Sequence, residues 1–422
     1  MGYGAISDHP LRAGILQEMH ARPYTPISTP RTILRQAFLF SSAKNNQPDN
    51  DAFAAWCKQN EVSLPQPNTR HHSVKIGEIR LTWERHSEFT SLTWDSAPFR
   101  NAEEKLIEFA QLHTPSILGS RPALIAAAKL VLVSQDKSSL NNLLDFHRDS
   151  LCMSTVGDGK AVIMTDFRQD LNGSTKYAIH NNGLDDASCG ILVRRLLEIE
   201  TYRCLALLGF EEVKSVSSKI ADIETELSAL TEMIGDETDL ESIRGNLNRI
   251  TDISADLVKL SASSQFRLSA TRAYYQLVNA RLTRIAEQPM QGYRKIEEFM
   301  GKRLAPAMRT CANVENRIAA ADRKLSGATD LLRTKVDIQV QAQNNELLET
   351  MNKRALMQYR LQSTVEGLSI AAISYYIVGL VSYLVKGMPA SNMLNPSIII
   401  AMAVPISLLL VWSLIRKVRK AY

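Results

Sequence analysis

The stretch GLSIAAISYYIVGLVSYLV, residues 367–385, decides the organisation of the chain because 19 consecutive residues carry no charge. A helix of about 20 apolar residues is long enough to cross the hydrocarbon core of a bilayer. A second apolar stretch, IIIAMAVPISLLLVWSLI, covers residues 398–415, and its Pro405 is tolerated in a membrane helix although it favours a kink. Together the two stretches predict a transmembrane hairpin over residues 367–422.

The charges that flank this hairpin predict its orientation. The sequence RKVRK follows the second stretch at 416–420, and Lys353, Arg354 and Arg360 precede the first, whereas the loop at 386–397 carries a single lysine. Positively charged flanks stay on the cytoplasmic side of a membrane. Both chain ends are therefore expected in the cytoplasm, in keeping with the polar N-terminus 1–11, which lacks the apolar segment of a secretory signal.

Polar residues inside the first stretch recur every seven positions and would share one helix face. Such a face predicts helix–helix contact or, in an oligomer, the lining of a pore. Two helices alone cannot enclose a pore, so transport would require a homo-oligomer. The candidate pore and loop residues are Ser369, Tyr376, Tyr383, Gly387, Met388 and Asn392.

The region before the hairpin has the apolar spacing of packed helices. Steps of three and four residues connect positions 220, 223, 227, 230 and 234, and the spacing resumes at Ile243 after a break at 235–239. This pattern predicts a helical hairpin or coiled coil over residues 186–290. After a second break at 288–292, one or more stalk helices are expected over 291–366, with minor interruptions at Gly301, Pro306 and Gly327.

Residues 1–185 alternate strand and helix patterns, which predicts an α+β domain with a mixed sheet. The expected strands are 33–40, 74–84, 89–94, 128–133, 161–167 and 175–179, and the expected helices are 11–20, 51–59, 103–112 and 140–146. The predicted fold is thus an α+β cytosolic domain, a long helical or coiled-coil stalk and a C-terminal two-helix transmembrane hairpin.

Arginine, histidine and glutamate gather in three segments of the soluble part. If 83–89 is a strand, side-chain alternation places Arg85 on the face opposite to Glu84 and His86. The members of the three polar clusters are His9, Arg12, His20 and Arg22 in the first, Glu84, Arg85, His86 and Glu88 in the second, and Arg194, Arg195, Glu198, Glu200 and Arg203 in the third.

The third cluster contains helical ion pairs by its spacing. Arg194 and Glu198 lie four residues apart and are expected to pair on a helix surface, and Arg195 is a second candidate partner of the same carboxylate. Polar clusters of this composition fit an ion-pair network that fixes the helix to the sheet. They also fit a site that binds an anion or shares a proton, and, with less support, a catalytic site.

Composition and motifs exclude several classes of protein. The net charge is +5, of which the tail 416–420 carries four, so the rest of the chain is near neutral and nucleic-acid binding is not expected. The 5 cysteines show no metal-ligand spacing, and the common nucleotide, hydrolase and zinc-protease motifs are missing. We therefore expect no enzyme, assign no catalytic, cofactor-binding or metal-ligating residue, and leave any cofactor unknown.

Four segments carry a resemblance to a known family. They are DHPLRAGILQEMHARPY (8–24), LTWERHSEFTSLTW (81–94), VIMTDF (162–167) and LVRRLLEIETYRCLALLGF (192–210). The chain resembles an uncharacterised family of proteobacterial membrane-anchored proteins, a domain of unknown function, over most of its length. The resemblance implies a bacterial inner-membrane location and supplies no activity.

The predicted architecture also resembles that of the CorA-type magnesium channels, which are pentamers. In that family an extracellular Gly-Met-Asn follows the first span. Here Gly387 and Met388 occupy the matching place, but Pro389 replaces the asparagine, and Asn392 is nearby. The resemblance implies a homo-oligomer with a divalent cation as a partner, while the replaced asparagine speaks against magnesium selectivity.

Three functional interpretations remain open. The first is a membrane-tethered homo-oligomeric scaffold whose cytosolic domain organises protein partners, which the missing catalytic motifs favour. The second is a CorA-like oligomeric cation channel or transporter, which the hairpin and the Gly-Met pair favour. The third is a membrane-bound ligand sensor or enzyme that uses the polar clusters.

Overall fold

The computed structural model describes residues 9, 12, 25–40, 47–66, 69–97, 102–119, 123–134, 146–236, 239–387 and 396–421. Nearly all of the expected helices 11–20 and 140–146 lies outside these residues. The chain divides into two compact units. The first comprises Met1–Met233 and Asn248–Ala328, and the second comprises Ile234–Leu247 and Thr329–Tyr422.

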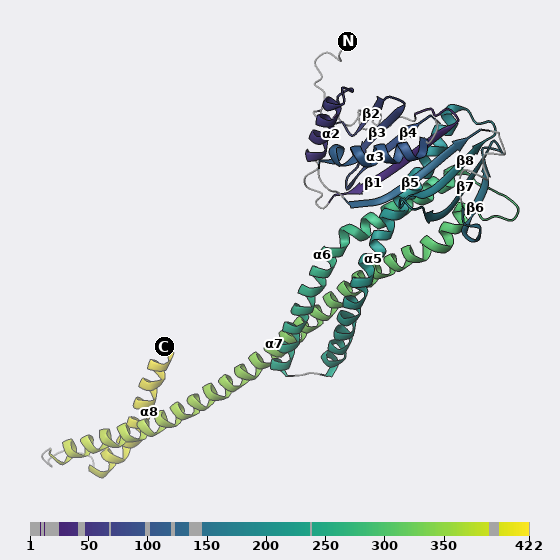
Figure 1. Ribbon diagram of the computed structural model, residues 1–422. Coiled ribbons are helices and arrows are strands. Elements are labelled where there is room, and N and C mark those ends of the chain that lie inside the picture. Colours follow the sequence, from purple (N-terminus) through teal and green to yellow (C-terminus); the bar gives the residue numbers. More distant parts are fainter. Residues whose placement is uncertain are drawn as a thin grey trace. The chain divides into compact units, whose positions relative to one another are not determined.

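A nine-stranded mixed sheet forms the centre of the first unit, in the order β2-β3-β4-β1-β5-β8-β7-β6-β9 (Figure 1). β5 and β8 pair in parallel, and the other strand pairs run antiparallel. This arrangement confirms the predicted α+β mixed sheet. The strands are β1 Arg31–Leu39, β2 His71–Ile76, β3 Ile79–Arg85, β4 Phe89–Ser96, β5 Ala123–Val133, β6 Cys152–Val156, β7 Ala161–Gln169, β8 Thr175–Asn181 and β9 Gln288–Pro289.

The structure corrects two strand predictions and adds two strands. Residues 74–84 form a hairpin of β2 and β3 and not one strand, because Gly77 adopts a left-handed backbone conformation with φ 58° and reverses the chain. The segment 83–89 is not a continuous strand either, since β3 ends at Arg85 and the chain turns before β4 begins at Phe89. β6 and the two-residue β9 were not expected.

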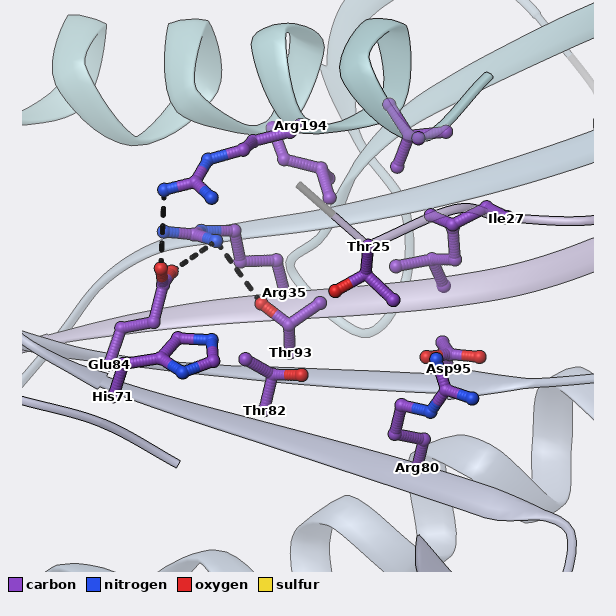
Figure 2. A pocket seen from close by; sticks show the side chains of 14 residues that line it. Thr25, Ile27, Arg35, His71, Arg80, Thr82, Glu84, Thr93, Asp95 and Arg194 are labelled. Atoms are coloured by element: carbon purple, nitrogen blue, oxygen red, sulfur yellow. Dashed lines mark hydrogen bonds and ion pairs between the residues drawn. The ribbon is translucent and has the colours of Figure 1, made fainter. Parts of the chain in front are cut away.

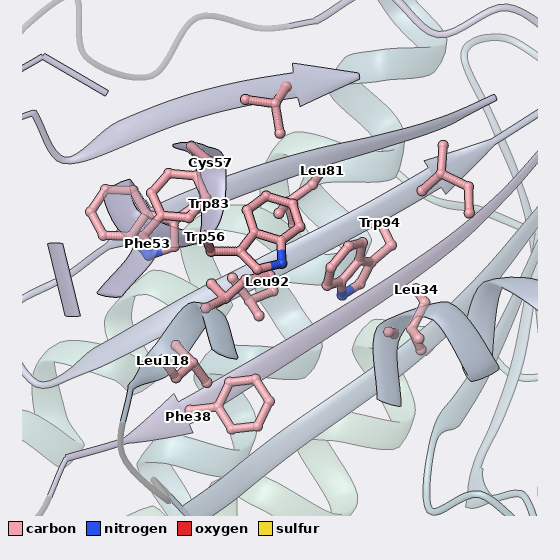
Figure 3. Close-up of a cluster of buried hydrophobic side chains, with 14 of the residues drawn as sticks. Leu34, Phe38, Phe53, Trp56, Cys57, Leu81, Trp83, Leu92, Trp94 and Leu118 are labelled. Atoms are coloured by element: carbon pink, nitrogen blue, oxygen red, sulfur yellow. The ribbon is translucent and has the colours of Figure 1, made fainter. Parts of the chain in front are cut away.

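Side-chain alternation gives the sheet two different faces. On one face, Trp83, Leu92 and Trp94 are fully buried under α2 (Gln47–Gln59) and α3 (Ala102–Leu118) (Figure 3). The rings of Trp83 and of Phe53, on α2, stack with their centroids 5.0 Å apart. The neighbouring positions on the same strands point to the opposite face, where α5 (Asp186–Asp236) packs.

The helices α5, α6 (Leu240–Ile285) and α7 (Ile296–Lys386) are separated where the sequence predicts breaks. The interruptions expected at Gly301, Pro306 and Gly327 do not occur, and α7 is continuous over 91 residues. A glycine costs a helix only about 1 kcal/mol, which packing along the helix offsets. Buried residues such as Met308, Val314 and Leu325 follow one side of α7.

Within the first unit these three helices pack against one another. Arg317 on α7 donates two hydrogen bonds to Glu224 on α5, with Nη2 2.6 Å from Oε2. Gly209 on α5 allows the closest approach, because a Cβ there would lie 2.0 Å from Oγ1 of Thr271 on α6. α7 is thus a third helix beside the predicted helical hairpin.

The second unit contains the two helices that are long and apolar enough to cross a membrane, the end of α7 and most of α8 (Pro396–Ala421). Ser374 on α7 and Ser407 and Val411 on α8 are buried. Tyr376 and Tyr383 are 71% and 77% exposed, whereas Ser369 is half-buried, so most of the face that the three residues share is left uncovered.

Candidate functional site

A polar pocket lies between the sheet and α5 in the first unit (Figure 2). Three arginines and two carboxylates line it, namely Arg35, Arg80, Arg194, Glu84 and Asp95. Three threonines and His71 add polar groups, and Ile33, Val193 and Leu197 add an apolar wall. The pocket offers about 80 Å³ of space to water.

Strand register assembles the floor of this pocket. In the sheet, Arg35 on β1 lies opposite Thr93 on β4, and Thr93 lies opposite Thr82 on β3. Glu84, two residues further along β3, lies opposite His71 on the edge strand β2. Because residues two apart on a strand share a face, these side chains all point toward α5.

Gly190 on α5 shapes the rim of the pocket. The segment before β1 lies so close to the helix that a Cβ at this position would be 2.1 Å from the carbonyl oxygen of Thr25. The backbone N–H of Ile27 donates to the carbonyl oxygen of Asp186 at 2.9 Å. Only glycine leaves room for Thr25 and Ile27 to reach the pocket.

The carboxylate of Glu84 is the centre of the charge network. Its Oε2 lies 3.1 Å from Nη1 of Arg35, and its Oε1 accepts a hydrogen bond from Nη2 of Arg194 at 3.4 Å. Burial raises the pKa of Glu84, but Arg35 and Arg194 outweigh it and lower the pKa to about 2. Glu84 is therefore a buried anion that joins β1 and β3 to α5.

The network extends to α6 through two further carboxylates. Arg194 Nε donates to Glu198 at 2.9 Å, which confirms the predicted helical ion pair, and Arg281 on α6 donates to the same carboxylate. Arg267 on α6 lies 3.2 Å from Glu88 in the turn after β3. These pairs connect the sheet, α5 and α6.

Glu200 organises a second network beneath β8. Its carboxylate accepts hydrogen bonds from the Tyr177 hydroxyl at 2.7 Å, from Thr175 at 2.9 Å and from Arg203 at 2.6 Å. Burial, followed by the charge of Glu200, raises the pKa of Tyr177 well above its ordinary value. The partners of Glu200 differ from those of Glu84, so the third predicted cluster is divided between two networks.

The remaining residues of the three predicted clusters make other contacts. The His86 ring stacks on Phe89 with centroids 4.0 Å apart. Arg85 closes β3, and Arg195 donates to the carbonyl oxygen of Arg284 at 2.7 Å. The backbone N–H of Arg12 donates to the carbonyl oxygen of His9 at 2.9 Å, while His20 and Arg22 lie outside the described residues.

Sequence reasoning missed three arginines of the network, Arg35, Arg267 and Arg281. Arg35 left a recognisable signal, because it stands inside the otherwise apolar strand ILRQAFLF and a charge there requires a partner. Arg267 and Arg281 lie on α6 among many exposed charges, and no feature of the sequence distinguishes them from those charges.

The described part of the chain has no group of three or more His, Cys, Asp or Glu side chains that could hold a metal ion. Of the loop candidates, Gly387 directly follows α7, and its N–H donates to the carbonyl oxygens of Tyr383 at 3.2 Å and Leu384 at 3.3 Å. Met388 and Asn392 lie outside the described residues.

The profile of a family described as "Protein of unknown function (DUF3422)" matches residues 7–422. The chain belongs to the DUF3422 family. This confirms the resemblance to an uncharacterised family. The matched residues include those of the polar pocket, of α5 and of both apolar helices. No protein with a curated description matches the chain.

This DUF3422 protein also has distant similarity to solved structures. The complete CorA magnesium transporter from Methanocaldococcus jannaschii shares 12% identity over 70% of this chain and 92% of the transporter, with a TM-score of 0.19. The full-length CmaX protein shares 11% identity over 70% of this chain and 89% of its own, with a TM-score of 0.15. Similarity this distant carries no information about function.

Proposed function

We propose that this DUF3422 protein is a membrane-anchored, homo-oligomeric scaffold of the bacterial inner membrane. In this proposal the two apolar helices anchor the chain, and the basic sequence 416–420 keeps both ends in the cytoplasm. The sheet domain then organises protein partners at the cytoplasmic side, and no reaction is assigned to it.

An exposed apolar stripe on α7 supports this proposal most directly. Between 336 and 368, large apolar side chains recur on one third of the helix circumference at about 100° per residue. Leu347, Met351 and Leu361 are 62%, 64% and 67% exposed. The members of this stripe are Val336, Val340, Leu347, Met351, Met357, Leu361, Val365 and Leu368.

A second copy of the chain is the partner that suits this stripe. Most of the charges of the segment, including Glu346, Glu349, Lys353 and Arg360, lie on another side of the helix, as in helices that pack side by side. The stripe continues directly into the apolar end of α7. Membrane anchoring would hold several copies parallel and in register, which lowers the entropic cost of pairing.

The mass of the full-length protein in nanodiscs tests this proposal. We expect an oligomer for the wild type and a shift toward the monomer for Leu347→Asn combined with Leu361→Asn. Ile338→Asn combined with Leu356→Asn is the matched control, since these residues are 60% and 61% exposed but lie on the other side of α7. A monomeric wild type, or equal effects of both pairs, would contradict the proposal.

Cation transport is a second candidate function. The observation that favours it is the uncovered face of Ser369, Tyr376 and Tyr383, which could line a path between copies of the hairpin. Flux of Mg²⁺ into liposomes that contain the full-length protein tests it. Tyr376→Phe and Ser369→Ala should change the flux if this face lines the path, and the absence of any flux would reject transport.

A further inference from the structure

We propose that the polar pocket between the sheet and α5 binds a phosphate group, either as inorganic phosphate or as a small phosphomonoester. This site is independent of the scaffold function, because its residues all belong to the first unit and none belongs to the α7 stripe. The proposal rests on charge, on two arginine groups and on the size of the pocket.

The pocket and its described ion-pair partners hold more positive than negative charge. Three guanidinium groups line it, and two more pair with Asp95 and with Glu198. Among the described residues, three carboxylates pair with this set of five arginines: Glu84, Glu198 and Asp95. The arginines are Arg31, Arg35, Arg80, Arg194 and Arg281. The excess of two positive charges matches a phosphomonoester, which carries about −1.5 to −2 at pH 7, and it disfavours a cation.

Arg35 has hydrogen-bonding capacity that the described residues leave unused. Its side chain is 6% exposed, and its Nη groups contact Thr93 at 3.2 Å, Ser91 at 3.0 Å and Glu84 at 3.1 Å. Its Nε has no hydrogen-bond partner among the described residues although it is buried. A buried donor without a partner costs free energy, and an anion or water in the pocket would satisfy it.

Arg80 is the second arginine with unused hydrogen-bonding capacity, and it is half-buried. It lies opposite Asp95 in the sheet register, and the two side chains point toward each other (Figure 2). Among the described residues it makes no hydrogen bond or close ion pair. Burial raises the pKa of Asp95, which Arg80 and Arg31 only partly counteract. Arg80 is therefore free to present its planar fork to a phosphate.

The size of the pocket limits the ligand. One ordered water needs roughly 10–15 Å³ of such space, so about 80 Å³ holds several waters or one small oxyanion. The hydroxyls of Thr25, Thr82 and Thr93 supply further polar contacts at the walls. Val193 and Leu197 on α5 would contact only a short apolar group, so the pocket suits a small phosphomonoester better than a nucleotide or a lipid tail.

Titration calorimetry of the full-length protein in nanodiscs tests the site, with inorganic phosphate and glycerol 3-phosphate as separate probes and acetate and MgCl₂ as comparisons. Saturable binding of phosphate identifies the free ion as a ligand, and binding of glycerol 3-phosphate alone identifies a phosphomonoester. Saturable binding of neither, or tighter binding of acetate than of both, would overturn the proposal.

Substitutions locate the binding. Arg80→Gln should weaken binding of the phosphate probe by at least about tenfold, since a charge-assisted hydrogen bond is lost, and Arg80→Lys should weaken it less. Thr82→Val, which leaves every charge in place, should also weaken it. Arg303→Gln removes an exposed arginine on α7 and should leave binding unchanged. Equal weakening by Arg303→Gln and Arg80→Gln would place the binding elsewhere and reject the site.

Discussion

Oε1 of Glu84 lies 3.4 Å from Nη2 of Arg194, and this contact joins residues 110 positions apart in the chain. The same carboxylate holds Arg35, which is buried on the sheet. Folding thus places one anion between two cations that belong to different layers of the first unit.

Replacing Glu84 by glutamine should strongly destabilise the first unit. The substitution leaves Arg35 buried without its counter-charge, and breaking a buried pair in this way costs about 3 kcal/mol or more. Chemical denaturation of the full-length protein, followed by tryptophan fluorescence, measures the change, because Trp56, Trp83 and Trp94 are buried in the same unit.

Glu226→Gln is the matched control for Glu84→Gln. Glu226 pairs with Arg249 at 3.7 Å, and both side chains are about half exposed, so its loss should change the free energy of unfolding by less than about 0.5 kcal/mol. Equal effects of the two substitutions would show that the Glu84 contacts do not hold the sheet to α5.

Stability should fall in acid because of Glu84. Its pKa is lowered from 4.5 to about 2 in the folded protein. As the pH falls below 4.5, the unfolded chain takes up the proton first, so the free energy of unfolding decreases until the folded carboxyl also titrates near pH 2. The loss is at most about 3 kcal/mol. Denaturation curves between pH 5 and pH 2 should show a shallower dependence in Glu84→Gln than in the wild type.

Glu287 should have the opposite pH dependence. Burial raises its pKa from 4.5 to about 7, although its Oε2 accepts a hydrogen bond from the backbone N–H of Glu297 at 3.3 Å. As the pH rises from 4.5 to 7, the unfolded chain loses the proton first, so the stability of the folded protein decreases. Glu287→Gln keeps an acceptor and removes the charge, so it should stabilise the protein at pH 8 and have little effect at pH 4.5.

The control for this prediction is Glu298→Gln on the first turn of α7. Glu298 is exposed, and Lys302 lowers its pKa. Its replacement should not stabilise the protein at pH 8. If Glu287→Gln gives no stabilisation at pH 8 either, burial does not control the titration of Glu287.

Gly209→Ala should separate α5 from α6. The added Cβ would lie 2.0 Å from Oγ1 and 2.8 Å from Cβ of the buried Thr271, and overpacking of this kind costs about 1–3 kcal/mol. Gly301→Ala is the matched control, because no atom lies within 4 Å of the new Cβ and alanine should stabilise α7 by about 0.5–1 kcal/mol. In thermal denaturation, Gly209→Ala should lower the melting temperature and Gly301→Ala should raise it. A higher melting temperature of Gly209→Ala would show that α5 and α6 can separate without a loss of stability.

Local patterns were sufficient for much of the architecture. Apolar spacing gave the breaks between the long helices, and uncharged length gave the two apolar C-terminal helices, because both properties depend only on neighbours along the chain. The pair Arg194 and Glu198 was predictable for the same reason, since four residues complete about one helical turn. The conformation of a glycine made one strand prediction wrong. Gly77 reverses the chain inside the segment 74–84, whose sequence pattern is typical of a single strand.

The sequence by itself therefore determined the fold class, the long helices and the apolar C-terminal pair. The tertiary structure alone decided which charges meet. Strand order and register place Arg35, Arg80 and Glu84 on one face, and the packing of α5 brings Arg194 to them and leaves a pocket between. Contacts across such separations depend on how every intervening element packs, so no local pattern of residues specifies them.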